Sequence, residues 1–166
     1  MHGARRTVIS GAVAVLLISA ACTEQPPTPR AELDERVALA LKLMNREAIN
    51  GRAFFKGVLD VRGRNDVYMA MDEDSIKHEA YFQPSILLGS PGQVITIRAT
   101  NWGFIAHTFV IHELGIESWV LPADGPGEAG QTKEFRVTFP RGAQPHLVRC
   151  RIHDTGGMVG ALVAIE

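Results

Sequence analysis

From residue 53 onward, closely spaced turn residues divide the sequence into short apolar stretches, and this pattern predicts an all-β fold. Apolar and polar residues alternate at 94–99 and 135–139, as expected for strands with one buried face. Glycine and proline clusters separate the stretches. Seven to nine short strands in about 110 residues predict a β-sandwich. The candidate strands lie at 53–61, 66–71, 79–88, 93–100, 107–112, 116–121, 132–139, 145–150 and 159–165.

One amphipathic helix is predicted before the strands, at residues 30–49. Its apolar residues recur at helical spacing and form one stripe: Leu33, Val37, Ala40, Leu41, Met44 and Ala48. Residues 23–29 are polar and proline-rich, which indicates an extended tether. Residues 22–52 are therefore interpreted as tether and helix. We expect the helix to pack against the following domain or to fill the space between that domain and a membrane, with partner binding as an alternative.

The N-terminal residues predict an export signal. Arg5 and Arg6 precede an uncharged, mostly apolar run at 7–20, which is too short for a membrane span of about 20 apolar residues. Small residues at 19–21 precede Cys22, so residues 1–21 are interpreted as a signal peptide. The segment resembles a bacterial lipobox, in which Cys22 becomes the lipidated first residue. Ser19 stands where such motifs usually have leucine, so simple secretory cleavage after Ala21 remains the alternative.

Charge and cysteine content exclude three classes of protein. The 166 residues carry a net charge of −1, unlike the strongly basic surface of a nucleic-acid-binding protein. Two cysteines are too few for a disulfide framework or a Cys₄ zinc site. We therefore expect a small globular domain whose function depends on a few special residues.

A cysteine, a histidine and a methionine lie close together near the C-terminus, as Cys150-x₂-His153-x₄-Met158. Thiolate, imidazole and thioether are the ligands of a blue-copper site, which a second histidine completes, and His107 on a separate strand is the candidate. A lone buried cysteine or methionine is more often core packing. If Cys22 is removed or lipidated, however, Cys150 has no disulfide partner in an oxidising compartment, and metal ligation explains its presence.

Residues 145–166, PHLVRCRIHDTGGMVGALVAIE, resemble the C-terminal copper loop and last strand of plastocyanin-like cupredoxins. Residues 101–111, NWGFIAHTFVI, resemble the strand that carries their first histidine. The resemblance covers about residues 53–166. It implies a Greek-key cupredoxin β-sandwich, preceded here by the helix, and one type 1 copper held by His107, Cys150, His153 and Met158. Thr108 departs from the pattern, because plastocyanins commonly have asparagine there to brace the cysteine loop. A threonine hydroxyl either replaces that bond or leaves the loop looser.

The remaining histidines and methionines are weaker ligand candidates. His112 follows His107 by five residues and would point to the opposite face of a strand. His146 precedes Cys150 by four residues, roughly 13 Å along a strand, too far to share its metal. His78 lies in a charged stretch at 72–79 that we interpret as a solvated loop. The methionines at 69 and 71 are interpreted as strand core.

The resemblance, together with the N-terminal export signal, predicts an exported electron carrier on the periplasmic or extracytoplasmic side of a membrane, with lipid anchoring and simple secretion as the alternatives. It would be a monomer that exchanges single electrons with transient redox partners and converts no substrate, with His153 as the electron port. Copper delivery or storage is the alternative binding role. A copper nitrite reductase or multicopper oxidase also contains this loop but needs a second copper centre. A binuclear oxidase-subunit site would need two loop cysteines, and Cys150 stands alone.

Overall fold

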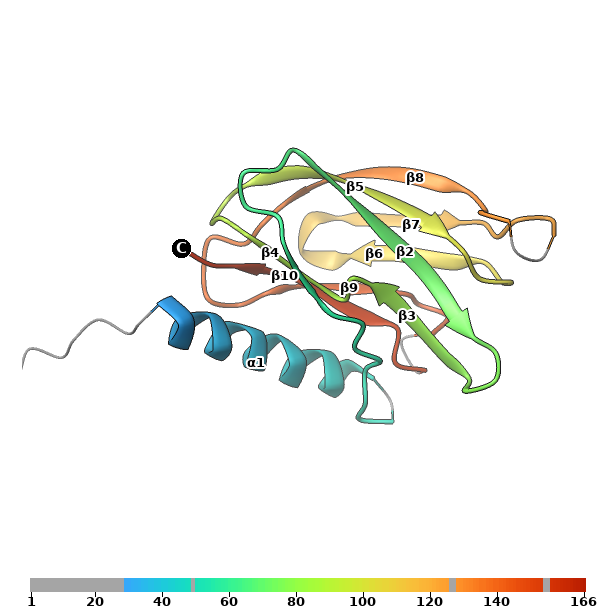
Figure 1. Ribbon diagram of the computed structural model, residues 1–166, viewed down its shortest axis with the longest axis horizontal. Coiled ribbons are helices and arrows are strands. Elements are labelled where there is room, and N and C mark those ends of the chain that lie inside the picture. Colours follow the sequence, from blue (N-terminus) through green and yellow to red (C-terminus); the bar gives the residue numbers. More distant parts are fainter. Residues whose placement is uncertain (1–28, 49, 126–127, 154–155) are drawn as a thin grey trace, which may run out of the picture.

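Two β-sheets face each other in the computed structural model, which describes residues 29–48, 50–125, 128–153 and 156–166 (Figure 1). The six-stranded sheet has the order β1 (Val58–Asp60), β4 (Ile86–Gly89), β10 (Val159–Ala164), β9 (His146–Arg149), β6 (His107–Ile111) and β7 (Ile116–Val120). The four-stranded sheet has the order β3 (Glu79–Gln83), β2 (Asp66–Asp74), β5 (Val94–Asn101) and β8 (Thr132–Thr138). The predicted β-sandwich is confirmed.

Strands distant in sequence are neighbours in both sheets. β10 lies between β4, with which it pairs in parallel, and β9, with which it is antiparallel. β6 pairs with β9 on one side and with β7 on the other. The start of β6 and the end of β9 therefore lie at the same end of the six-stranded sheet. This arrangement brings residues near 107 and 150 together.

The space between the sheets is filled by alternate residues of the strands. Along β2, Val67, Met69 and Met71 are buried while Tyr68 points outward and is exposed. Phe109 stacks on Phe135 of the opposite sheet, with ring centroids 4.2 Å apart. The interpretation of both methionines as core residues is confirmed, because neither side chain is exposed at all.

Helix α1 (Pro29–Glu47) covers the outer face of the six-stranded sheet and runs beside β10 (Figure 1). Its predicted apolar stripe faces the sheet: Ala40 and Met44 are fully buried, in a cluster that includes Leu88 and Val163. β10 is consequently buried on both faces along its whole length. The packing role predicted for the helix is confirmed, and burying one methionine side chain stabilises such a contact by about 1.5–3 kcal/mol.

Within the described residues, no helix is both long and apolar enough to cross a membrane. The expected signal peptide at 1–21, the lipidation site Cys22 and residues 23–28 of the expected tether lie outside these residues. The last residue of that tether, Pro29, begins α1.

Several strand boundaries differ from those expected. The predicted strand 79–88 is two strands in different sheets, separated by Pro84 and Ser85 after a cis Gln83–Pro84 bond. Of the predicted strand 53–61, only Val58–Asp60 pairs, at the edge of its sheet. The strand expected at 107–112 ends at Ile111, and a 3₁₀ turn (His112–Leu114) follows. The prediction for the charged stretch at 72–79 was wrong in part, because β2 continues to Asp74.

Candidate metal centre

Three predicted ligands come together at one end of the sandwich. His107 is the first residue of β6, Cys150 follows the last residue of β9, and His153 lies in the turn after Cys150. One donor atom from each of the three residues lies within 4.8 Å of the other two. The pairing of β6 with β9 places His107 at the start of one strand next to Cys150, directly after the other, and the short turn adds the third donor.

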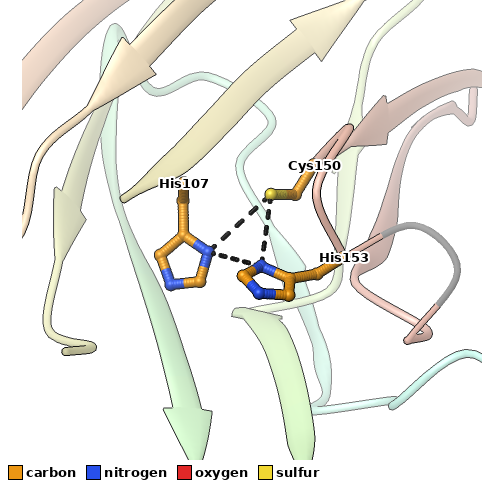
Figure 2. Close-up of side chains that lie close together, drawn as sticks. All are labelled: His107, Cys150 and His153. Carbon is orange, nitrogen blue, oxygen red and sulfur yellow. Dashed lines mark hydrogen bonds between the residues drawn. The ribbon is translucent and has the colours of Figure 1, made fainter. Parts of the chain in front are cut away.

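The donor atoms face one another (Figure 2). His107 Nδ1 lies 3.1 Å from His153 Nδ1, and Cys150 Sγ lies 3.7 Å from the first and 3.5 Å from the second. The other ring nitrogen of His107 points away from this triangle (Figure 2). Both histidines therefore offer Nδ1, together with one thiolate sulfur, to a common point.

The environment of Cys150 favours the thiolate. Burial alone would raise the pKa of this thiol, since its side chain is fully buried. Hydrogen bonds from His107 and His153, and from the backbone N–H groups of Thr108 and Ile152, outweigh burial and lower the pKa to about 5. The Thr108 amide lies 3.3 Å from the sulfur. Because the thiolate is the form that binds metals, Cys150 can act as a metal ligand at neutral pH without first losing a proton.

The turn that carries His153 is held by its own backbone. The His153 N–H donates to the Cys150 carbonyl at 3.0 Å, and the Met158 N–H donates to the His153 carbonyl at 2.9 Å. The Cys150 N–H donates to the Met158 carbonyl at 3.2 Å. These bonds connect the three residues directly, so displacement of one would displace the others.

The segment after α1 supports the same turn from outside. The Phe54 N–H donates to the Gly157 carbonyl at 3.0 Å. Gly157 has a φ of +93°, and a Cβ atom there would lie 2.6 Å from the Arg52 carbonyl oxygen. The Ala53 N–H in turn donates to the Asn45 side chain of the helix at 2.8 Å. The helix is thus linked through residues 52–54 to the backbone next to Met158.

Thr108 braces the cysteine loop. Its hydroxyl accepts a hydrogen bond from the Arg151 N–H at 2.7 Å, while its own N–H points to the cysteine sulfur. Of the two outcomes expected for Thr108, the structure supports replacement of the asparagine bond rather than a looser loop.

Met158 is fully buried and belongs to the same core cluster as Cys150. One thiolate and two imidazoles with a methionine nearby match the His₂Cys site with a weak axial thioether that is typical of blue copper. Soft sulfur stabilises Cu(I), and imidazole nitrogen also binds Cu(II). The residues present therefore fit a copper ion that changes its charge by one electron.

The other histidines lie outside the donor cluster. His78 and His112 are exposed, and His146 is paired in β9 opposite Leu162. The sequence interpretation that set them aside agrees with the structure over the described residues.

Two residues near the site were missed from the sequence. The Asn101 side chain donates to the carbonyls of Ile105 and Val120, at 2.8 and 2.9 Å. These bonds hold the backbone of the segment that leads into His107. Glu73 lies 3.3 Å from His107 and was assigned to a solvated loop. A signal for Glu73 was present, because it continues the inward positions 67, 69 and 71 of one strand.

Comparisons with known proteins find similarity in structure only. No protein-family model and no curated protein matches the sequence. A histidine-to-methionine variant of rusticyanin matches over 75% of this chain and 92% of its own, with 15% identity and a TM-score of 0.48. Auracyanin from Roseiflexus castenholzii matches over 61% of this chain and 98% of its own, with 20% identity and a TM-score of 0.42.

A chain of a heme-copper terminal oxidase dimer also matches, with 14% identity and a TM-score of 0.40 over 61% of this chain. The present chain spans 65% of that chain. The strand order of the two sheets and the Cys–His–His cluster at the ends of β6 and β9 are observed in this chain itself and do not depend on these matches. The chain folds as a two-sheet β-sandwich with an added N-terminal helix.

Proposed function

We propose that this protein is an exported, mononuclear type 1 copper protein that carries single electrons between redox partners. The observation that supports the proposal best is the convergence of Cys150, His107 and His153, with donor atoms within 4.8 Å of one another on paired strands and a short turn. A bound copper ion would supply one-electron exchange between Cu(II) and Cu(I). A rigid donor set suits that role, because little rearrangement accompanies the change in charge.

Each residue has a distinct part in this proposal. The Cys150 thiolate supplies the charged ligand, and its low pKa keeps it deprotonated near neutral pH. His107 and His153 supply nitrogen through Nδ1. Met158, buried in the same core cluster as Cys150, would supply a weak thioether donor and tune the potential.

His153 is the proposed electron port. His107 is fully buried, whereas His153 is partly exposed and lines a surface cavity of about 240 Å³ together with Ile105 and Gly156. Exposed apolar side chains occur on the adjoining segments, among them Phe104 and Ile152. A partner that docks there approaches the site through one imidazole, and small interfaces suit transient electron exchange.

The cellular location is proposed from the sequence. The charged and apolar N-terminus supports export, with lipid attachment at Cys22 holding the protein at the extracytoplasmic membrane face. The described residues bring together one group of three potential ligands, so we propose one copper per chain. We further propose that the chain is a monomer and converts no substrate.

Copper delivery or storage is the second candidate. It would favour exchangeable, exposed ligands over a buried thiolate between two strands. An oxidoreductase role would need a further copper centre, and the described residues bring together only this one His/Cys/Asp/Glu group.

Voltammetry of the copper-loaded protein tests the proposal. We expect a reversible one-electron couple and no catalytic current when oxygen or nitrite is added. A catalytic current would favour an oxidoreductase, and transfer of copper to a Cu(I) chelator on mixing would favour delivery. His107→Ala serves as the matched control, because it removes a buried ligand and should abolish the couple.

A further inference from the structure

Glu73 of β2 reaches from the four-stranded sheet to a proposed ligand on the other sheet. Its Oε2 atom lies 3.3 Å from His107 Nε2, within ion-pair distance although outside hydrogen-bond angles. The His107 side chain is fully buried, and that of Glu73 is only 12% exposed. Neither of these two atoms has a hydrogen-bond partner in the described part of the chain. These two buried polar atoms therefore lie within ion-pair distance of each other and make no hydrogen bond within the described residues.

The carboxylate is held in this position by the segment before β6. Glu73 Oε1 accepts hydrogen bonds from the backbone N–H groups of Phe104 and Ile105, at 2.6 and 3.0 Å. With Oε1 engaged, Oε2 remains directed at the imidazole. The side chain thus connects the backbone of residues 104–105 to His107.

Gly103 permits this close arrangement. A Cβ atom at residue 103 would lie 2.8 Å from Glu73 Cδ and 3.0 Å from His107 Nε2. The backbone consequently closes over the carboxylate–imidazole contact, and water is excluded from it. Exclusion of water strengthens the electrostatic interaction between the two groups.

We propose that Glu73 is a positioning residue that sets both the tautomer and the donor strength of His107. A carboxylate at Nε2 favours hydrogen on Nε2, so that Nδ1, which faces Cys150 Sγ, is the nitrogen left to bind a metal (Figure 2). Its negative charge also makes the imidazole a stronger donor, which stabilises Cu(II) more than Cu(I). This inference rests on the proposed copper function.

Glu73 also clamps the backbone of residues 104–105, so the test must separate that structural role from an effect on His107. Glu73→Gln does so, because the amide oxygen can still accept from Phe104 and Ile105 while the charge is lost. Asp74→Asn is the matched control: it makes the same change one residue further along β2. Asp74 faces Lys77 at 3.4 Å, and an asparagine oxygen can still accept from the Ile76 and Lys77 amides.

The first measurement is the reduction potential of the copper-loaded wild type and both variants. Outer partners of ligating histidines typically change metal affinity by 10–100-fold. We expect Glu73→Gln to lower the ratio of Cu(II) to Cu(I) affinity by about tenfold, which raises a one-electron potential by about 59 mV. Asp74→Asn should leave the potential at the wild-type value. Equal potentials in wild type and Glu73→Gln, or equal shifts in both variants, would overturn the inference.

The second measurement needs neither copper nor a variant. Imidazole nitrogen NMR of the metal-free wild type should show hydrogen on Nε2 of His107. A ring that carries hydrogen on Nδ1 alone would overturn the inference even if Glu73→Gln failed to fold. If the copper-loaded wild type were not blue, the proposed function would fail, whereas a blue wild type with an unshifted Glu73→Gln would refute only the role of Glu73.

Discussion

The low pKa of Cys150 predicts that the metal-free protein becomes more stable as the pH rises. The folded thiol has a pKa of about 5, against an ordinary value of 9.0. Between these values the folded state binds fewer protons at Cys150 than the unfolded state, so the free energy of unfolding increases with pH. The stabilisation is complete above the unfolded pKa and is lost as the pH falls through the folded pKa.

The slope follows from proton linkage. One proton contributes about 1.4 kcal/mol for each pH unit, so Cys150 should add about 2–3 kcal/mol between about pH 6 and about pH 8. The assay is urea unfolding of the metal-free, reduced protein at several pH values, compared with Cys150→Ser. Serine does not titrate, and subtracting its curve removes the contributions of other groups. A difference between the two proteins that stays constant over this range would refute the reasoning.

Three further perturbations test separate parts of the molecule. Met158→Leu should keep the blue colour and raise the reduction potential measured by voltammetry, whereas Met158→Gln should lower that potential. If Met158 only packs in the core, Met158→Leu should leave the potential unchanged and lower the free energy of unfolding by less than about 1.5 kcal/mol. Gly157→Ala should lower the free energy of unfolding by at least about 1 kcal/mol in thermal or urea unfolding, because residue 157 has a positive φ and its Cβ would contact the Arg52 carbonyl. Gly156→Ala is the control, since the nearest atom to its Cβ is 3.4 Å away. An equal loss of stability in both variants would contradict this. Cys22→Ala should release the protein from membranes with its spectrum intact, and a protein already soluble with Cys22 would indicate simple secretion.

The sandwich and two of the three converging ligands could be predicted because their signals are local. Strand alternation and turn residues mark the sheet elements, and Cys150 and His153 lie three residues apart in one turn. His107 was predicted from its strand and the resemblance of residues 101–111. The proximity of His107 to Cys150 depends on the pairing of β6 with β9.

The features that were missed depend on contacts between distant segments. Charge at 72–79 indicated a solvated loop, yet β2 extends to Asp74 because β3 pairs with residues 70–74, beyond the end of the pairing with β5 at Met71. Glu73 is consequently placed inward, against His107 on the other sheet. The support that Arg52 and Phe54 give to Gly157 likewise requires the helix to lie against β10, which no local pattern specifies.

The visible and EPR spectra of the copper-loaded protein, compared with those of Cys150→Ser, test the central claim most directly. The account predicts one copper per chain, an intense blue absorption from the Cys150 thiolate and narrow copper hyperfine splitting, all lost in Cys150→Ser. A colourless Cu(I)-only protein, or a strong blue band that persists without the Cys150 sulfur, would contradict it.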